Sequence, residues 1–519
     1  MREKEVVIIA PNTPGSYKFG EKQRENLALG CLGASLSQHG ISNSLIDARF
    51  DNLSPEEVAD EIVRLSPSVV GLSFMEQEPA IWSQPLVKRI REGTSGTHVV
   101  AGSYFPTLDP DKCRDVLPQI DSIAQGEGEE TIVELVLRIS NGDDWKSTRG
   151  LIVNDNGILV PNPRRNLIAN LDDLPEPTRY ADARRLSKVS LEGSRGCFSK
   201  CTFCSINPHL NPEKSTWRGK SPQRIVAEMS HLRDIYPDID QFRFVDADFI
   251  GLGKYDERLA EIAKGLIESG FSTSNAKIFI ETQSRNVVSI PPQVWDLLHQ
   301  AGLYQVFLGV ETGSEKVKRC IAKSSSLEDD RKAIDYLKQF GINVAYGFIM
   351  LNPWTNMEDV LNNVKVLGSL GNAGLDKYFS ELILTPGTRA FETISKENGI
   401  YIEKVEGVDH YLYPLPDSLE NIRRVGHYML EHPEYRTFLT DIASFYTFLG
   451  ELSIQGDNPS LADLRTQLDQ LNLDIFLKIA NISQDSAGVL DNDTISSLLG
   501  QLMEKYKPRL SILRNSVNS

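Results

Sequence analysis

The sequence predicts an α/β protein with an N-terminal doubly wound parallel sheet, a central partial (β/α)6 barrel of the TIM type and a helical C-terminal region. Two observations predict this fold. Short apolar strands alternate with helical stretches twice along the 519 residues, first from the N-terminus and again from residue 188. Beyond about residue 405 the pattern is helical. The predicted domains are 1–140 (first sheet), 141–187 (connector), 188–400 (barrel) and 401–519 (helices).

The first sheet is expected to have five strands with helices between them: residues 5–10, 44–47, 68–73, 98–102 and 120–124. The helix at 54–65 is expected to begin with Ser54 as N-cap and Pro55 in its first turn. Ligands of such sheets bind beyond the carboxyl ends of the strands. The loops that fall there are 11–20, Ser73, Gly102 and 126–128.

The connector carries two turn signals. Apolar residues 151–153 and 158–160 flank the pair Asn156-Gly157, which favours a tight hairpin. Residues 171–178 form an acidic stretch interrupted by prolines, as in a linker.

The second alternation predicts six barrel strands: 188–192, 241–246, 277–282, 305–311, 343–350 and 377–384. The most informative feature of the chain follows the first of them, since Cys197, Cys201 and Cys204 lie within eight residues. Thiolates are soft ligands, so such dense spacing predicts one soft metal centre. Three ligands on a four-iron cluster would leave one iron without a protein ligand.

The Cys-x3-Cys-x2-Cys spacing, with Arg195-Gly196 before it and Phe203 beside the last cysteine, resembles the signature of the radical S-adenosylmethionine superfamily over roughly residues 188–390. The resemblance implies a [4Fe–4S] cluster on Cys197, Cys201 and Cys204, with S-adenosylmethionine on the fourth iron. It also implies cleavage of this cosubstrate to a 5′-deoxyadenosyl radical. An external one-electron reductant of the flavodoxin or ferredoxin type is then needed.

Polar residues at later strand ends resemble further motifs of this superfamily. The resemblance implies contacts with S-adenosylmethionine from Phe203, Asp246, Asp248, Gln283, Arg285, Gly309 and Glu311. Each acid alone could equally be a helix N-cap or a solvated charge. The alternative for the cysteines is a structural zinc site completed by His209.

Residues 1–140 resemble the cobalamin-binding, Rossmann-like domain that precedes many radical enzymes of this type, on segments 69–75, 98–102 and 123–130. The resemblance implies cobalamin contacts from Ser73, Gly102, Gly126, Glu127 and Gly128, where glycines permit close backbone approach. The loop 11–20 lacks the histidine that ligates cobalt in cobalamin mutases. This absence fits radical methyltransferases, and it equally fits a scaffold that binds no cofactor.

Charge, hydropathy and cysteine content exclude several classes of protein. A net charge of −16 argues against a general binder of nucleic-acid backbones. No apolar run approaches the roughly 18–20 residues that span a bilayer. Few scattered cysteines fit a reducing cytoplasm better than a disulfide framework. We therefore expect a cytoplasmic protein without a membrane span that acts on a small-molecule substrate.

Together, these resemblances favour a cobalamin-dependent radical enzyme, a transferase that methylates an unactivated carbon or phosphorus of a biosynthetic intermediate through a 5′-deoxyadenosyl radical and methylcobalamin. One alternative is a cyclase, oxidase or rearrangement enzyme that uses the same cofactors without methyl transfer. Another is a zinc-stabilised binding protein without enzymatic activity.

Overall fold

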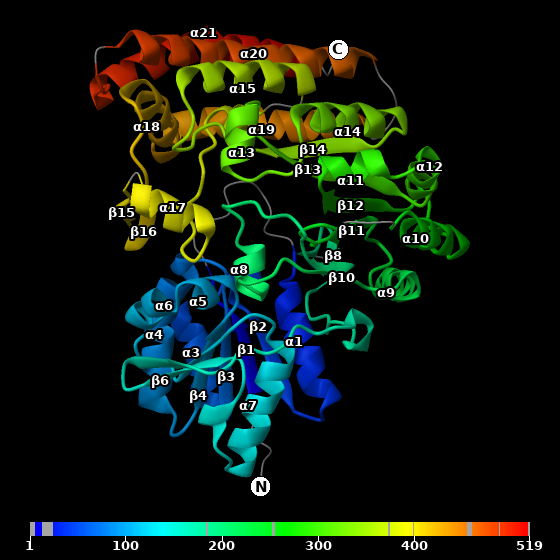
Figure 1. The fold of residues 1–519 in the computed structure, drawn as a ribbon, viewed down its shortest axis with the longest axis vertical. Coiled ribbons are helices and arrows are strands. Elements are labelled where there is room, and N and C mark those ends of the chain that lie inside the picture. Colours follow the sequence, from blue (N-terminus) through cyan, green and yellow to red (C-terminus); the bar gives the residue numbers. More distant parts are fainter. Residues whose placement is uncertain are drawn as a thin grey trace.

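The computed structural model describes residues 6–12, 24–182, 185–251, 255–371, 374–397, 399–453, 459–486 and 488–516. Figure 1 shows the parts of the protein stacked along its long axis, with the N-terminal sheet at the bottom, a second sheet in the middle and long helices at the top. In the described part of the chain, no helix is both long and apolar enough to cross a membrane.

The N-terminal sheet has seven strands in the order β2-β1-β3-β4-β5-β6-β7. The first five are parallel: β1 (Val6–Ala10), β2 (Asn43–Asp47), β3 (Val69–Ser73), β4 (His98–Gly102) and β5 (Ser122–Ala124). The predicted hairpin is confirmed as β6 (Leu151–Asp155) and β7 (Ile158–Pro161), and it continues this sheet because β6 pairs antiparallel with β5. Its turn residues Asn156 and Gly157 both have positive φ.

Helices cover both faces of this sheet, so its central strands are apolar throughout. One face packs against α1 (Leu27–Gln38) and α7 (Glu129–Asn141). The other packs against α2 (Ala48–Asp51), α3 (Pro55–Leu65), α4 (Gln77–Gly93) and α6 (Pro110–Val116). Ser54 caps α3 as predicted, in a capping box with Glu57. The remaining short elements are α5 (Tyr104–Leu108) and single 3₁₀ turns at Trp145–Ser147 and Leu171–Asp173.

The second sheet is an open, parallel part of a barrel with five strands in the order β14-β13-β12-β11-β8. They are β8 (Val189–Leu191), β11 (Gln241–Phe244), β12 (Lys277–Thr282), β13 (Leu303–Glu311) and β14 (Asn343–Phe348). The predicted sixth strand at 377–384 does not form, because its first residues belong to the helix α16 (Leu375–Tyr378). Of that segment, only Glu381 pairs with the barrel, as a bridge to Leu351.

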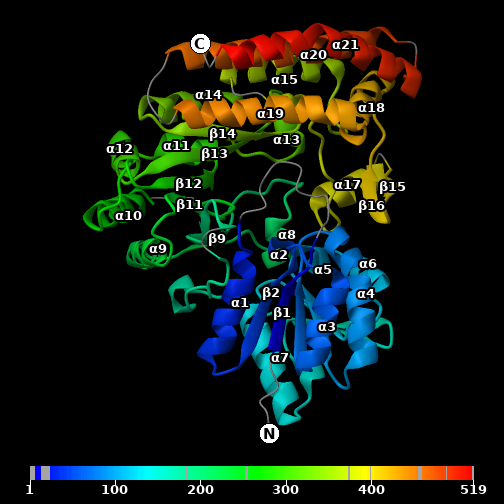
Figure 2. The ribbon, with the colours of Figure 1, turned by 180° about the vertical axis from the view of Figure 1, so that it is seen from behind.

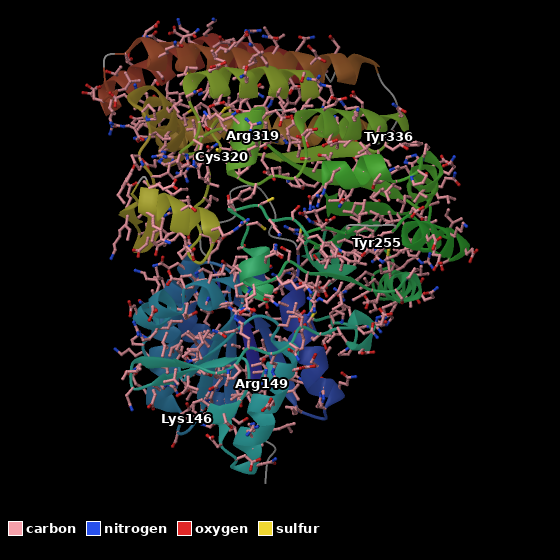
Figure 3. All side chains as sticks on the ribbon, in the orientation of Figure 1. Lys146, Arg149, Tyr255, Arg319, Cys320 and Tyr336 are labelled. Atoms are coloured by element: carbon pink, nitrogen blue, oxygen red, sulfur yellow. The ribbon has the colours of Figure 1, made fainter. Side chains whose placement is uncertain are left out.

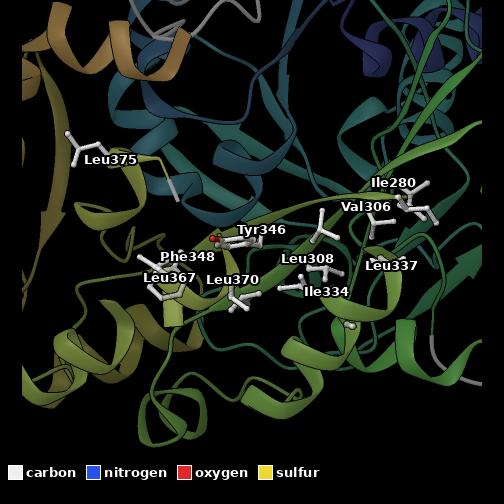
Figure 4. Close-up of a cluster of buried hydrophobic side chains, with 14 of the residues drawn as sticks. Ile280, Val306, Leu308, Ile334, Leu337, Tyr346, Phe348, Leu367, Leu370 and Leu375 are labelled. Carbon is white, nitrogen blue, oxygen red and sulfur yellow. The ribbon is translucent and has the colours of Figure 1, made fainter. Parts of the chain in front are cut away.

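Helices pack on the outer face of the second sheet: α9 (Pro222–Ile235), α10 (Asp256–Glu268), α11 (Ser284–Ser289), α12 (Pro292–Gln300), α13 (Glu315–Cys320), α14 (Leu327–Gln339) and α15 (Met357–Leu370). Figure 4 shows this core, where Val306 and Leu308 of β13 lie beside Ile334 and Leu337 of α14. Inward-facing residues of β12 and β14 are only half buried, while their outward-facing neighbours are buried.

The C-terminal region begins with α17 (Arg389–Glu397) and the hairpin β15 (Tyr401–Val405) and β16 (Val408–Leu412). It continues as α18 (Asp417–Glu431), α19 (Pro433–Ser453), α20 (Pro459–Asp485) and α21 (Asn492–Asn515). Figure 2 shows α19 to α21 running across the outer helices of the barrel, whose core they share. In Figure 3, Arg319 and Cys320 mark the end of α13, and Lys146 and Arg149 lie in the N-terminal part.

Candidate active site

A small antiparallel ribbon brings the chain into the cysteine loop. It consists of β9 (Ser194–Gly196) and β10 (Trp217–Gly219), with Gly196 opposite Trp217. Gly196 has φ +88°, and a Cβ on it would lie 2.1 Å from the carbonyl oxygen of Thr216. Only glycine fits this turn, which leads directly into Cys197.

The three thiols of the loop lie in one neighbourhood, and burial raises the pKa of Cys197 to about 12, with further contributions from Asp248, Cys204 and Cys201. However, no group of three His, Cys, Asp or Glu side chains among the described residues converges on a point that could hold one metal ion. A single zinc needs every sulfur at about 2.3 Å from the ion. A four-iron cluster binds each thiolate through a different iron, so thiols that are near one another but not convergent fit the cluster better.

His209, the fourth ligand of the zinc alternative, belongs to α8 (Ile206–Leu210) and stacks on Tyr104 with ring centroids 4.1 Å apart. Burial, followed by Arg164 and Arg195, lowers the pKa of His209 to about 4, so the imidazole is neutral. Among the described residues His209 does not converge with the thiols on a point that could hold one metal ion, so the structure does not support the zinc alternative.

Two of the predicted polar residues meet at the first cysteine. Gln283 Nε2 lies 3.1 Å from Cys197 Sγ and 3.2 Å from Asp248 Oδ2. Gln283 Oε1 accepts hydrogen bonds from Ser199 and Ser324. Thus Gln283 links the cysteine loop to the ends of β11 and β12.

Asp246 is hydrogen-bonded to the turn that precedes β9. It is 2% exposed and accepts hydrogen bonds from the Gly193 N–H and the Ser194 hydroxyl. Burial raises its pKa to about 7. The carboxylate thus fixes the turn before β9, and its predicted contact with S-adenosylmethionine stays a prediction.

A buried ion pair faces Cys201. Lys323 Nζ lies 3.2 Å from Glu311 Oε1, and the two side chains are 4% and 13% exposed. Gly309 makes room for this pair, because a Cβ there would lie 2.5 Å from both charged atoms. Burial alone would lower the pKa of Lys323, but Glu311 and Cys201 raise it. Lys323 was not predicted from the sequence, where the only signal for it is the requirement for glycine at 309.

The remaining two predicted residues are Arg285 and Phe203. Burial raises the pKa of Cys201 and Arg285 opposes this rise. The buried Nε of Arg285 has no hydrogen-bond partner among the described residues. A carboxylate-bearing cosubstrate would provide the acceptor that this guanidinium lacks. Phe203 packs against a small apolar cluster that contains Leu382 and Leu384.

A cavity of about 750 Å³ separates the N-terminal sheet from the barrel. Its walls include all five residues predicted to contact cobalamin: Ser73, Gly102, Gly126, Glu127 and Gly128. From the barrel side, Ser190, Glu192, Arg195 and His209 line it. Of the predicted loop 11–20, residues 13–20 lie outside the described residues. The cavity lies at the carboxyl ends of both sets of strands, where such folds bind ligands.

The backbone of the cavity wall at Gly102 and Ser103 has two features of a ligand site. A Cβ on Gly102 would make only ordinary contacts, the nearest at 3.6 Å to Ala124, so its absence leaves space on the cavity side. The next residue, Ser103, has φ 87° and ψ −158°, a conformation that is essentially restricted to glycine. Strained backbone of this kind gathers at ligand sites.

Comparison with known proteins agrees with both halves of this site. Residues 191–367 match the radical SAM superfamily, and residues 23–136 match the B12 binding domain. An uncharacterised methyltransferase of Pyrococcus horikoshii is 28% identical over 76% of this chain and 83% of its own. An anaerobic magnesium-protoporphyrin IX monomethyl ester cyclase of Synechocystis is 24% identical over 68% of this chain and 69% of its own.

The fold has a solved counterpart. The cobalamin-dependent S-adenosylmethionine radical enzyme OxsB, with aqua-cobalamin and S-adenosylmethionine bound, superimposes with a TM-score of 0.75 over 100% of this chain and 80% of its own, at 15% identity. With the two domain matches, this confirms the predicted fold class and the expected cofactors, a [4Fe–4S] cluster, S-adenosylmethionine and cobalamin. The chain belongs to the radical S-adenosylmethionine enzymes that carry a cobalamin-binding domain.

Proposed function

We propose that this enzyme transfers a methyl group to an unactivated carbon, or to phosphorus, of a small biosynthetic intermediate. The observation that carries the proposal is the closeness of the two cofactor sites. Tyr104 lines the cavity. Gly196, directly before Cys197, and Ile206, two residues after Cys204, line the same cavity, so the cysteine loop borders it. A substrate at this junction is within reach of both cofactors.

The residues divide the work as follows. Cys197, Cys201 and Cys204 would hold the cluster, and Arg285 and Lys323 would orient the polar end of S-adenosylmethionine. The glycines of the cavity wall would let the corrin approach the backbone. When bound, the cluster and S-adenosylmethionine supply hydrogen-atom abstraction, and cobalamin carries the methyl group. The protein contributes position and exclusion of water.

A second function keeps the cofactors but omits methyl transfer, giving ring formation, oxidation or rearrangement. The similarity to a protein named as a cyclase supports it. The similarity to a protein named as a methyltransferase is higher and covers more of both chains, and it supports methyl transfer.

The products distinguish the two functions. The test is anaerobic reconstitution with iron, sulfide and hydroxocobalamin, followed by mass spectrometry with candidate substrates. S-adenosylhomocysteine and 5′-deoxyadenosine that rise together support methyl transfer, whereas 5′-deoxyadenosine alone supports the second function. Replacing dithionite by reduced flavodoxin or ferredoxin in the same assay tests the proposed one-electron partner.

The cluster assignment has its own test. Cys201→Ala should abolish 5′-deoxyadenosine formation, because two thiolates cannot hold the cluster in place. Cys320→Ala, the same change at a thiol of α13 outside the loop, should leave it unchanged. A Cys201→Ala enzyme that cleaves S-adenosylmethionine at the wild-type rate would refute the assignment.

A further inference from the structure

A buried network of charges joins the two domains beside the cysteine loop. Arg195 of β9 donates to Glu127 Oε1 at 3.0 Å and to Glu129 Oε1 at 2.6 Å, both in the cobalamin-binding domain. It also contacts Glu192 at the end of β8, at 2.9 Å. The side chains of Arg195, Glu127 and Glu129 are no more than 10% exposed. Removing one partner of such a buried ion pair is strongly destabilising, because the other charge is left buried without compensation.

A second arginine strengthens this junction. Arg218 of β10 lies opposite Arg195 in the ribbon. It donates to Glu127 Oε2 at 3.0 Å and to the Ile168 carbonyl at 2.6 Å. The Ile168 N–H in turn donates to Glu127 Oε2 at 2.9 Å. Both carboxylate oxygens of Glu127 therefore accept hydrogen bonds at the domain junction, although Glu127 also lines the cavity.

The network acts on the position of the first cysteine. Arg195 precedes Cys197 by two residues, and the residue between them, Gly196, is held in a turn that allows no side chain. On the other side, Glu127 and Glu129 flank Gly128 of the cavity wall. Figure 2 shows β9 between the two sheets. A shift of the cavity wall is thus passed to the cysteine loop through short, charged contacts.

We propose that Glu127 and Glu129 are positioning residues that hold the cysteine loop at a fixed place relative to the cobalamin cavity, through Arg195 and Arg218. This inference rests on the proposed methyl transfer. We call these four residues, Glu127, Glu129, Arg195 and Arg218, the clamp. The clamp keeps the site of hydrogen abstraction and the site of methyl delivery at the same substrate atom. Since a misplacement of about 1 Å can cost about a hundredfold in rate, loosening the clamp uncouples the two events.

The test uses isosteric changes. Glu129→Gln removes one charge of the clamp and keeps its shape, and Glu127→Gln does the same while keeping an acceptor for the Ile168 N–H. The matched control is Glu130→Gln at the neighbouring residue, whose carboxylate is 60% exposed and pairs with Arg165 of the connector and with neither arginine of the network. Iron content, bound cobalamin and melting temperature show whether each variant is loaded and folded.

We expect S-adenosylhomocysteine formed per 5′-deoxyadenosine to fall by about ten- to a hundredfold in both clamp variants and to stay at the wild-type value in Glu130→Gln. A second readout needs no turnover: the electron paramagnetic resonance spectrum of the reduced cluster, recorded with and without hydroxocobalamin. Cobalamin should change the wild-type spectrum, and the clamp variants should lose this response.

Either clamp variant alone tests the proposal. If Glu129→Gln fails to load iron, the result for Glu127→Gln is used. Loaded clamp variants with a wild-type product ratio and a wild-type spectral response would overturn the proposal. A wild-type enzyme that forms no S-adenosylhomocysteine would instead refute methyl transfer, and the spectral response would still test the clamp.

Discussion

Replacing Gly196 by alanine tests whether the turn before Cys197 controls the cluster site. Gly196 has φ +88°, and its Cβ would lie 2.1 Å from the Thr216 carbonyl oxygen. Placing an alanine in a left-handed conformation costs about 1–2 kcal/mol. Relieving the contact with a backbone atom forces the β9–β10 ribbon apart, which costs about 1–3 kcal/mol more.

Gly96→Ala provides the matched control. Gly96 has φ +79°, and a Cβ there would meet nothing within 4 Å. It therefore controls for a left-handed alanine that lies outside the β9–β10 ribbon. The combined cost at Gly196, about 2–5 kcal/mol, corresponds to a factor of about 30 to 5,000 in the population of the cluster-binding loop conformation.

The assay is the rate at which a chelator removes iron from the anaerobically reconstituted protein. We expect Gly196→Ala to lose iron about 30 to 5,000 times faster than Gly96→Ala, and Gly96→Ala to match the wild type. Equal rates in the two variants would refute the idea that the ribbon fixes the loop.

Two further predictions concern buried charges. Lys323→Met removes the partner of Glu311 beside Cys201. It should weaken the binding of S-adenosylmethionine by at least about tenfold in calorimetry, the effect of losing one hydrogen bond to a charged group. Lys332→Met, at an exposed pair with Glu328, should have no such effect, and unchanged affinity in the first variant would contradict the predicted role. The second prediction is a pH dependence of stability, because burial lowers the pKa of His98 from 6.5 to about 4. The contribution of neutral His98 to the free energy of unfolding is complete above pH 6.5. It is lost as the pH falls toward 4, which lowers the free energy of unfolding by up to about 3 kcal/mol. Urea unfolding at pH 7.5 and pH 5 should show this loss in the wild type and a smaller loss in His98→Gln; equal losses would disprove it.

Most strands could be predicted because buried parallel strands are continuous apolar runs. The strands at 98–102 and 277–282 form at the predicted residues. The segment 377–384 reads equally apolar, but α16 takes its first residues, and only Glu381 pairs with the barrel. Tertiary context decides such cases, and a local pattern carries no information about it.

In the candidate site too, residues of a local motif could be predicted, and contacts made by tertiary structure could not. The cysteine loop is a local motif, so the sequence displays all its residues together. The pairing of Lys323 with Glu311 depends on how the chain turns after β13, which spacing does not reveal. Glu127 was predicted as a cofactor contact because segment 123–130 resembles the cobalamin-binding domain. Its arginine partners lie more than sixty residues away along the chain, at 195 and 218.

The ribbon of β9 and β10 bears on how this enzyme can be recombined with its relatives. A chimera that takes its cobalamin-binding domain from one parent and its barrel from another inherits each half of a five-charge junction separately. A barrel donated with Arg195 and Arg218 but set against a domain without acids at 127 and 129 would leave the buried Arg218 without a carboxylate and Arg195 with Glu192 alone. A working chimera therefore needs all four positions, 127, 129, 195 and 218, from the same parent.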